Sequence, residues 1–391
     1  MLNSPFSPWP SFTQEEADAV SQVVLSNKVN YWTGTEGREF EKEFAAWAGT
    51  DYAIALMNGT VALDVALKAV GVVPGDEVIT TPRTFLASAS SIVTAGATPK
   101  FADVDLNSQV ITADSIKAVL TPKTKAVIVV HLAGMPAEMD DIMALSQQHG
   151  FYVIEDCAQA HGAQYKGQSV GSIGHIGAWS FCQDKIMTTG GEGGMVTTND
   201  KTLWSAMWSY KDHGKSYDAI YHKQHPPGFR WLHESFGTNW RMLEMQAVIG
   251  RIQLKRMTEW TQKRQHNGAK IDAALAPYHC IRRVSVPDHI QHAEYKHYAF
   301  VKPERLAEGW TRDRIVNEIN ALGVPAFQGS CSEVYLEKAF DDTGFRPVQR
   351  LPNAVELGDT SLMFLVHPTL TDAELDKTAE AIRAVLDLAS K

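Results

Sequence analysis

The sequence predicts an α/β protein with a mainly parallel sheet in a large domain and a smaller α/β domain at the C-terminus. Apolar segments alternate with helix-period stretches through the first two thirds of the 391 residues, which is typical of a parallel sheet covered by helices on both faces. From about residue 250 one long amphipathic pattern replaces this alternation. The chain also exceeds the roughly 250 to 300 residues at which one hydrophobic core stops growing, so we expect two domains.

Seven apolar segments are expected to form the strands of the sheet, because turn residues bound them. They lie at residues 53–57, 76–81, 99–104, 125–134, 151–156, 176–181 and 193–199. Functional side chains in such sheets collect at the carboxyl ends of the strands. We therefore expect one edge of the sheet to gather Asn58, Gly59, Thr60, Thr84, Phe85, His131, Asp156, Gln159 and Lys185.

The later part of the chain is expected to begin with a helix that bridges the two domains. The stretch GRIQLKRMTEWTQKRQHNGAKIDAAL, residues 250–275, has continuous amphipathic periodicity. We divide the chain accordingly into a large domain at residues 1–250 and a small domain at residues 251–391. A capping box formed by Thr371 and Glu374 predicts the start of the last helix.

The composition is that of an ordinary enzyme, with 44% hydrophobic and 21% charged residues. A net charge of −9 argues against nucleic acid as the main partner. No apolar run approaches the roughly 18 residues of a membrane span, and MLNSPFSPWP does not resemble a signal peptide, so we expect a cytoplasmic protein that binds no membrane. The cysteines show no CxxC spacing, so we expect reduced, mostly buried thiols without zinc or disulfides: Cys157, Cys182, Cys280 and Cys331.

A candidate anion site lies in MNGTVALDVAL. A strand ends there, Gly59 allows a tight turn, and a helix is expected to begin at Thr60. Free backbone amides and a hydroxyl at the positive end of a helix can hold a phosphate. The alternative is a simple helix cap, which is what most such turns are.

Asp156 stands at the end of an apolar strand in VIEDCAQAHG, so its carboxylate requires a cationic or hydrogen-bonding partner. A pyridinium nitrogen is a suitable partner, because a carboxylate keeps the ring protonated and makes it an electron sink. A structural Asp that caps the next helix is the alternative. Glu155 is expected to face the other side of the strand.

Lys185 lies in SFCQDKIMTTGGEGG, among several glycines. The order of residues excludes a nucleotide-binding phosphate loop, in which the glycines precede the lysine. A lysine that forms a Schiff base must be partly desolvated and must be able to move, and small neighbours provide that room. Ser180, at the end of the preceding strand, is expected to add a hydroxyl to the same anion site.

The order of these features, an anion site, a strand-end Asp and a later lysine, is that of a fold type I pyridoxal phosphate enzyme. More specifically, the blocks GTVAL, TFLASASS, VIEDCAQAHGA, SFCQDKIMTTGGEGGM and GTNWRMLEMQAVIGRIQL resemble, in order, those of the DegT/DnrJ/StrS family of sugar aminotransferases. The resemblance runs from WTGTEGREFEKEFAAWAG to HPTLTDAEL. It implies a mainly parallel seven-stranded sheet in the large domain and pyridoxal 5′-phosphate as the cofactor.

The resemblance also implies roles for individual residues. Lys185 would form the Schiff base and act as general acid and base, and Asp156 would pair with the pyridine nitrogen. Gln159 would lie near the phenolic oxygen of the ring, and Phe85 would stack on the ring, although an isolated Phe more often packs in a core. The phosphate would be held by Gly59, Thr60, Ser180 and, across the interface of a homodimer, Asn239 of the neighbouring subunit.

Two stretches depart from the family pattern. TTGGEGG contains one more glycine than the usual TTGEGG, which affects any role assigned to Glu192. Residues 216–240 form a longer segment than expected, rich in histidine and aromatic residues, which we interpret as a substrate-facing loop. For His213, His222 and His225 in or near it, a solvated loop histidine is the alternative.

The function implied is transfer of an amino group from L-glutamate to a 3- or 4-keto sugar linked to UDP, dTDP or GDP, for surface polysaccharide, glycan or antibiotic sugar biosynthesis. The related sugar 3-dehydratases carry histidine in place of the lysine, so Lys185 favours transamination. A pyridoxal phosphate-dependent sugar lyase or dehydratase and a non-catalytic regulatory protein of the same fold are the alternatives.

Overall fold

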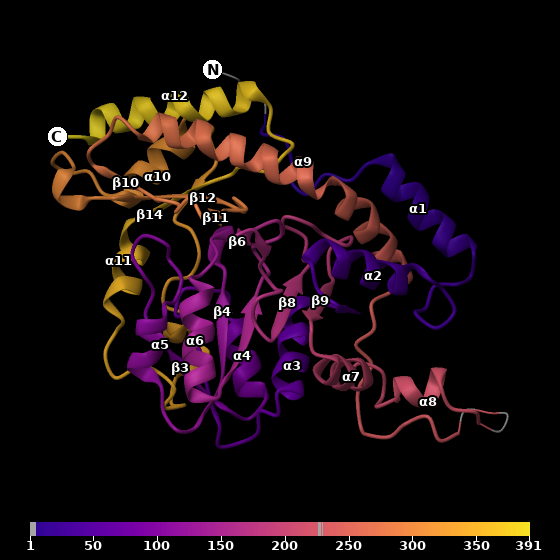
Figure 1. Cartoon of the computed structure of the whole chain (residues 1–391). Helices are drawn as coiled ribbons and strands as arrows, with labels where there is room; N and C mark the ends of the chain where they lie inside the picture. Colours follow the sequence, from indigo (N-terminus) through magenta and orange to yellow (C-terminus); the bar gives the residue numbers. More distant parts are fainter. Residues whose placement is uncertain (1–4, 226–227, 229) are drawn as a thin grey trace.

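The computed structural model describes residues 5–225, 228 and 230–391 (Figure 1). The seven predicted strands form one central sheet, as expected. Its order is β1 (Tyr52–Leu56), β9 (Gly194–Thr198), β8 (Ile176–Ser180), β5 (Tyr152–Asp156), β4 (Thr124–Val130), β2 (Glu77–Thr80) and β3 (Thr98–Phe101). Strand β9 pairs antiparallel with β1 and β8, whereas the pairs β8–β5, β5–β4, β4–β2 and β2–β3 are parallel. The predicted mainly parallel sheet is therefore confirmed.

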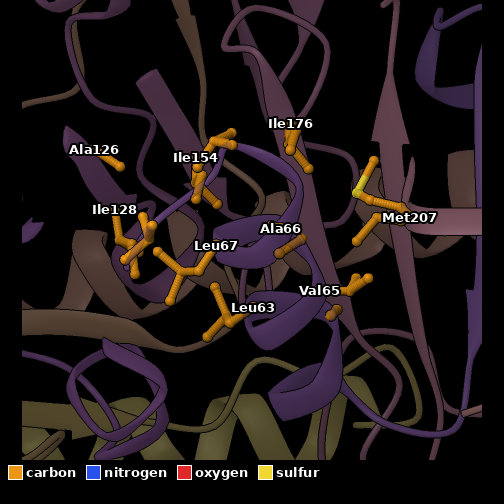
Figure 2. Close-up of a cluster of buried hydrophobic side chains, with 14 of the residues drawn as sticks. Leu63, Val65, Ala66, Leu67, Ala126, Ile128, Ile154, Ile176 and Met207 are labelled. Carbon is orange, nitrogen blue, oxygen red and sulfur yellow. The ribbon is translucent and has the colours of Figure 1, made fainter. Parts of the chain in front are cut away.

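Helices cover both faces of this sheet. Along β4, Ile128 and Val130 pack toward α3 (Gly59–Ala69), α4 (Ala87–Thr94) and α7 (Lys201–Tyr210). Figure 2 shows this cluster, with Leu63 and Leu67 of α3 facing the sheet. Val127 and Val129 belong to the opposite face, which α5 (Ala113–Val119) and α6 (Met139–His149) cover. Burial of both faces accounts for strands that are apolar throughout.

The long bridging helix α9 spans Glu244–Leu275 and begins earlier than the predicted Gly250. It packs against α1 (Gln14–Leu25) and α2 (Glu36–Ala48) near its start, and it also contacts α12 (Asp372–Ala389). Figure 1 shows α9 and α12 side by side above the central sheet. Because α9 runs across residue 250, the division into residues 1–250 and 251–391 stays a prediction.

A second sheet of four antiparallel strands follows α9 in the chain. The order of its strands is β10 (Ile281–Arg283), β12 (His297–Val301), β14 (Ser361–Phe364) and β13 (Ala326–Phe327). The helices of this part of the chain are α10 (Arg312–Ala321), α11 (Pro352–Thr360) and α12, and its 3-10 turns are η2 (Pro303–Arg305), η3 (Val334–Leu336) and η4 (Lys338–Phe340). The predicted capping box of Thr371 and Glu374 at the start of α12 is confirmed.

Three short strands connect the two parts of the chain: β6 (Gln164–Tyr165) pairs with β7 (Gln168–Ser169) and with β11 (Ile290–Gln291). A short helix, α8 (Tyr217–Tyr221), lies beside α7 and away from the centre of the sheet (Figure 1). Across residues 5–225, 228 and 230–391, no helix is both long and apolar enough to cross a bilayer.

All four cysteines are free thiols. Cys157 and Cys280 are buried, as predicted, whereas Cys182 is half-buried and Cys331 is exposed. The expectation of mostly buried thiols is therefore wrong for these two, because both line a cavity rather than the core.

Candidate active site

A cavity of about 670 Å³ lies at the carboxyl ends of β5 and β8, beside the start of α3. The structure brings together around it seven of the predicted site residues: Gly59, Thr60, Phe85, Asp156, Gln159, Ser180 and Lys185. Residues from the later part of the chain form a second wall, which includes Tyr295, Lys296, Tyr298, Ser330 and Met363. The cavity therefore lies between the two parts of the chain.

The predicted anion site is built from the first turn of α3, which begins at Gly59 rather than Thr60. The Asn58 side chain accepts the Val61 amide at 3.0 Å. The amides of Gly59 and Thr60 belong to the first turn and have no partner within the helix. A Cβ atom on Gly59 would lie 2.5 Å from Cβ of Ser180, so only glycine lets α3 approach the end of β8 this closely. Backbone amides and the Ser180 hydroxyl thus meet at one point, which suits a phosphate.

Asp156 ends β5 and is 6% exposed. Its Oδ2 accepts the Ser88 hydroxyl at 2.8 Å and its Oδ1 accepts the Ala158 amide at 3.1 Å. Burial raises the pKa of this carboxyl, against these two hydrogen bonds. No Lys, Arg or His of the described residues forms an ion pair with it. A buried carboxylate in this position fits a protonated ring nitrogen, which supplies the missing cation.

His131 does not join the cavity, and the prediction that placed it at the functional edge is wrong. Val130 lines the cavity, and His131, the next residue, points to the opposite side of the sheet and is buried there before the chain turns at η1 (Leu132–Gly134). There its Nε2 lies 2.9 Å from Glu155, which faces away from the cavity as predicted. His131, Glu155 and Cys157 are close enough to hold a metal ion. Glu155 already accepts the amides of Gly171, Ile173 and Gly174, so we interpret the group as structural.

Lys185 follows β8 in a turn, where its amide donates to the Cys182 carbonyl at 3.1 Å. Its own carbonyl accepts the indole Nε1–H of Trp9 at 2.9 Å, so the N-terminal segment fixes the lysine backbone. The Lys185 ammonium lies 5.4 Å from the centre of the Tyr295 ring. The hydroxyl of that tyrosine donates to Asp184 at 2.5 Å. The side chain is half-buried, which leaves it access to the cavity.

The extra glycine of TTGGEGG has a conformational explanation. Gly190 and Gly191 have φ values of 84° and 123°, in the region that side chains disfavour. The turn that they form presents the Glu192 carbonyl to the Thr189 hydroxyl at 2.6 Å and to the Gln246 amide at 2.7 Å. Glu192 itself lines the cavity. The two glycines therefore form the turn that leads from Thr189 to Glu192.

Phe85 and Gln159 occupy the cavity in different ways. Phe85 is 70% exposed, so the alternative of core packing is wrong for this residue. The Gln159 side-chain oxygen accepts the Ala133 amide at 2.8 Å. This contact orients the amide group and leaves its NH₂ free to donate into the cavity.

Asn239 is exposed, and it is not among the described residues that line the cavity of its own chain. The nearby histidines make local contacts: His222 lies 3.1 Å from Asp218, and His225 lies 2.7 Å from the Ala219 carbonyl. Three residues of the 216–240 segment, Pro226, Pro227 and Phe229, lie outside the described residues.

Sequence reasoning missed the second wall and two supporting residues, Ser88 and Trp9. Ser88 stands one helical turn after Thr84 in TFLASASS, and its hydroxyl lies 2.8 Å from that of Thr84, so this spacing could have indicated it. Tyr295 and Lys296 had no such signal, because they follow the cofactor blocks at a large separation in the chain.

Comparison with known proteins finds relatives over nearly the whole chain. The DegT/DnrJ/EryC1/StrS aminotransferase family model matches residues 10–383. An aminotransferase from Psychrobacter cryohalolentis, solved by X-ray crystallography, is 65% identical and superposes with a TM-score of 0.97 over 98% of this chain and 99% of that chain.

Two curated relatives match over nearly the full length. GDP-perosamine synthase of Caulobacter vibrioides is 37% identical, over 93% of this chain and 94% of its own. The dTDP-3-amino-3,4,6-trideoxy-alpha-D-glucose transaminase of Streptomyces venezuelae is 31% identical, over 94% of this chain and 91% of its own. Both names describe enzymes of amino sugars carried on a nucleotide.

Proposed function

The chain belongs to the DegT/DnrJ/EryC1/StrS aminotransferase family, and we propose that it transfers an amino group from L-glutamate to a keto-deoxysugar carried on a nucleotide. The observation that carries this proposal is the cavity in which a buried Asp156, a candidate anion site at Gly59 and a half-buried lysine, Lys185, converge. The names of the two curated relatives support a nucleotide-linked sugar as the acceptor.

The cofactor is pyridoxal 5′-phosphate. The residues of the cavity fit this molecule at three places. Backbone amides and hydroxyls at Gly59, Thr60 and Ser180 would hold its phosphate, and the buried Asp156 carboxylate would hold its ring nitrogen. Phe85 would cover one face of the ring, and the NH₂ group of Gln159 would donate to the phenolic oxygen.

Bound pyridoxal phosphate supplies an electron sink for the pair of electrons left when a proton is removed from the carbon next to the amino group. Asp156 maintains this capacity by keeping a proton on the ring nitrogen. The buried position of Asp156 suits it to hold a protonated ring nitrogen, because a carboxylate in a buried site interacts strongly with a cation. The Ser88 hydroxyl fixes the orientation of this carboxylate through its hydrogen bond to Oδ2.

Lys185 would hold the cofactor in the resting enzyme. Once released, its Nζ would take the proton from the carbon that bears the amino group and deliver it as the general acid of the same proton shift. The backbone of Lys185 is held by Trp9 and by the Cys182 carbonyl, whereas its side chain extends beside the Tyr295 ring. This arrangement fixes the backbone at Lys185, and the side chain enters the cavity.

The proposal includes a homodimer in which Asn239 of each subunit reaches the phosphate of the other. Asn239 is exposed, and its backbone forms a bridge with Asp212, which follows α7. Two large apolar side chains that precede it in the chain are exposed, with Trp231 at 76% and Phe236 at 98%. Large apolar side chains of this kind could pack under a partner subunit. We also propose that the enzyme works in the cytoplasm on pathway intermediates of glycan biosynthesis.

A two-step spectroscopic experiment tests the function. The purified holoenzyme is mixed with L-glutamate alone, and we expect one equivalent of 2-oxoglutarate per subunit together with loss of the absorbance of the lysine-bound cofactor. Addition of a 3- or 4-keto sugar nucleotide should then restore that absorbance. A sugar lyase or dehydratase would not form 2-oxoglutarate, and a non-catalytic protein would show neither change.

A further inference from the structure

The two walls of the active-site cavity have different tasks. The first wall contains Gly59, Asp156 and Ser180, to which the proposed function assigns the cofactor. The second wall contains Tyr295 and Lys296, which precede β12. Since the cofactor occupies the first wall, the second wall faces the substrate that reacts at Lys185.

Lys296 is a second lysine in this cavity. Its ammonium lies 4.9 Å from the centre of the Tyr295 ring, and the Lys185 ammonium lies 5.4 Å from the same point. Both amines therefore share one aromatic side chain. Lys296 forms no ion pair with any carboxylate of residues 5–225, 228 and 230–391.

The surroundings of Lys296 lack a free counter-ion. Asp184 is the carboxylate that acts on it, but the Tyr295 hydroxyl already donates to that group at 2.5 Å. Burial, together with the charges of Arg264 and Lys185 and against that of Asp184, lowers the pKa of Lys296 to about 8, so at neutral pH the side chain stays mainly protonated. Arg264 is itself buried, with Nε and Nη2 unpartnered among the described residues. A half-buried cation in such a field favours an anionic ligand.

We propose that Lys296 binds the α-carboxylate of the amino donor, an inference that rests on the proposed function. The donor carries a carboxylate on the very carbon whose amine reacts at Lys185. The nucleotide sugar carries its anionic pyrophosphate on C1, several bonds from a keto group at C3 or C4. Of the two substrates, only the donor therefore places a negative charge next to the reacting atom, where Lys296 shares the Tyr295 ring with Lys185.

The test compares Lys296→Gln and Lys296→Arg with the wild-type holoenzyme. Binding of glutarate, an unreactive dicarboxylate, is measured by calorimetry, and each half-reaction is followed separately in single turnovers. Lys302→Gln is the matched control. Lys302 directly follows β12, about 20 Å from Lys296 along the extended strand, and it does not line the cavity. Retention of cofactor absorbance shows that each variant is folded.

We expect Lys296→Gln to weaken glutarate binding and to raise the glutamate concentration that gives half-maximal rate, each by about 10- to 100-fold. This is the effect expected when one charge-assisted hydrogen bond is lost. Lys296→Arg should retain most of the binding, and the keto-sugar half-reaction should change less than about twofold. Unchanged glutarate affinity in Lys296→Gln, or a loss confined to the keto-sugar half-reaction, would overturn the inference. If the wild type instead forms no 2-oxoglutarate from glutamate, the proposed function itself fails.

Discussion

The hydroxyl of Ser88 donates a 2.8 Å hydrogen bond to Oδ2 of Asp156, although the two residues come from different elements, α4 and β5. The Thr84 hydroxyl lies 2.8 Å from that of Ser88, so a short chain of hydroxyls ends on the carboxylate. Burial raises the pKa of Asp156, and the hydrogen bond from Ser88 opposes this effect. Ser88 therefore favours the ionised form of this buried acid, which suits a cationic partner.

Ser88→Ala removes the hydroxyl that donates to Asp156. Loss of the hydroxyl should raise the pKa of Asp156 further, and only the ionised carboxylate binds a protonated ring. Cofactor affinity is lost as the pH falls through the pKa of Asp156, so in the variant this loss should begin at a higher pH. At neutral pH we expect affinity to fall about 10- to 100-fold, as for a hydrogen bond to a charged group. Titration of the apoenzyme with the cofactor, followed by fluorescence at several pH values, measures this affinity. Ser90→Ala on the same helix is the control.

Asp156→Asn separates charge from shape. The amide has nearly the size of the carboxylate and can still accept from Ser88, but it cannot keep a proton on the ring nitrogen. We expect cofactor binding to persist through the phosphate contacts, while the single-turnover rate with glutamate falls on the order of 10²- to 10³-fold, as for other preorganised electrostatic contacts. A variant that stays within tenfold of the wild-type rate would show that Asp156 has no electronic role.

Gly59→Ala tests the anion site. The added Cβ would lie 2.5 Å from Cβ of Ser180, which forces α3 and β8 apart. We expect the free energy of unfolding to fall by about 1–3 kcal/mol, as for other overpacked sites, and phosphate affinity to fall with it. Chemical denaturation and phosphate titration measure the two effects. Gly59→Ala combined with Ser180→Gly should recover part of the stability but not the affinity, since the serine hydroxyl is then lost.

A buried pair outside the cavity gives a prediction about stability. Lys211 is fully buried, with Nζ 3.9 Å from Glu41 and 3.6 Å from the centre of the Tyr31 ring. Each of Lys211→Met and Glu41→Gln should destabilise the protein by about 3–5 kcal/mol, because one buried group loses its partner. The double variant should lose less than the sum of the two.

The same lysine should produce a characteristic dependence on pH. Burial lowers the pKa of Lys211 to about 8, below the ordinary value of 10.5 that the unfolded chain retains. Between these values the unfolded state binds more protons, so this group adds stability as the pH rises. The free energy of unfolding of the wild type should therefore increase relative to that of Lys211→Met from about pH 8 upward. An equal response of the two proteins would contradict this assignment.

The sheet and the first wall of the site could be predicted from sequence because their signals are local. Each strand is an apolar run bounded by turns, and Gly59, Asp156 and Ser180 lie at or directly after the end of one. His131 shows the limit of reading strand ends alone, because it follows Val130, which lines the cavity, and so faces the opposite, buried side together with Glu155.

The second wall could not be predicted, since its contacts depend on how two distant parts of the chain meet. Tyr295 reaches Asp184 and Lys185 only after α9 has carried the chain across the molecule. Trp9 likewise contacts the Lys185 carbonyl from the opposite end of the sequence. Long-range contacts of this kind leave no periodicity in either segment.

The central claim is that Lys185 carries the cofactor, and borohydride reduction of the wild-type holoenzyme tests it most directly. Reduction makes the bond between lysine and cofactor permanent, and peptide mapping by mass spectrometry then identifies the modified residue. Two lysines line the cavity, so the experiment has a built-in alternative. We predict a phosphopyridoxyl group on Lys185 and none on Lys296. A label on Lys296, or no label on either lysine, would contradict the account.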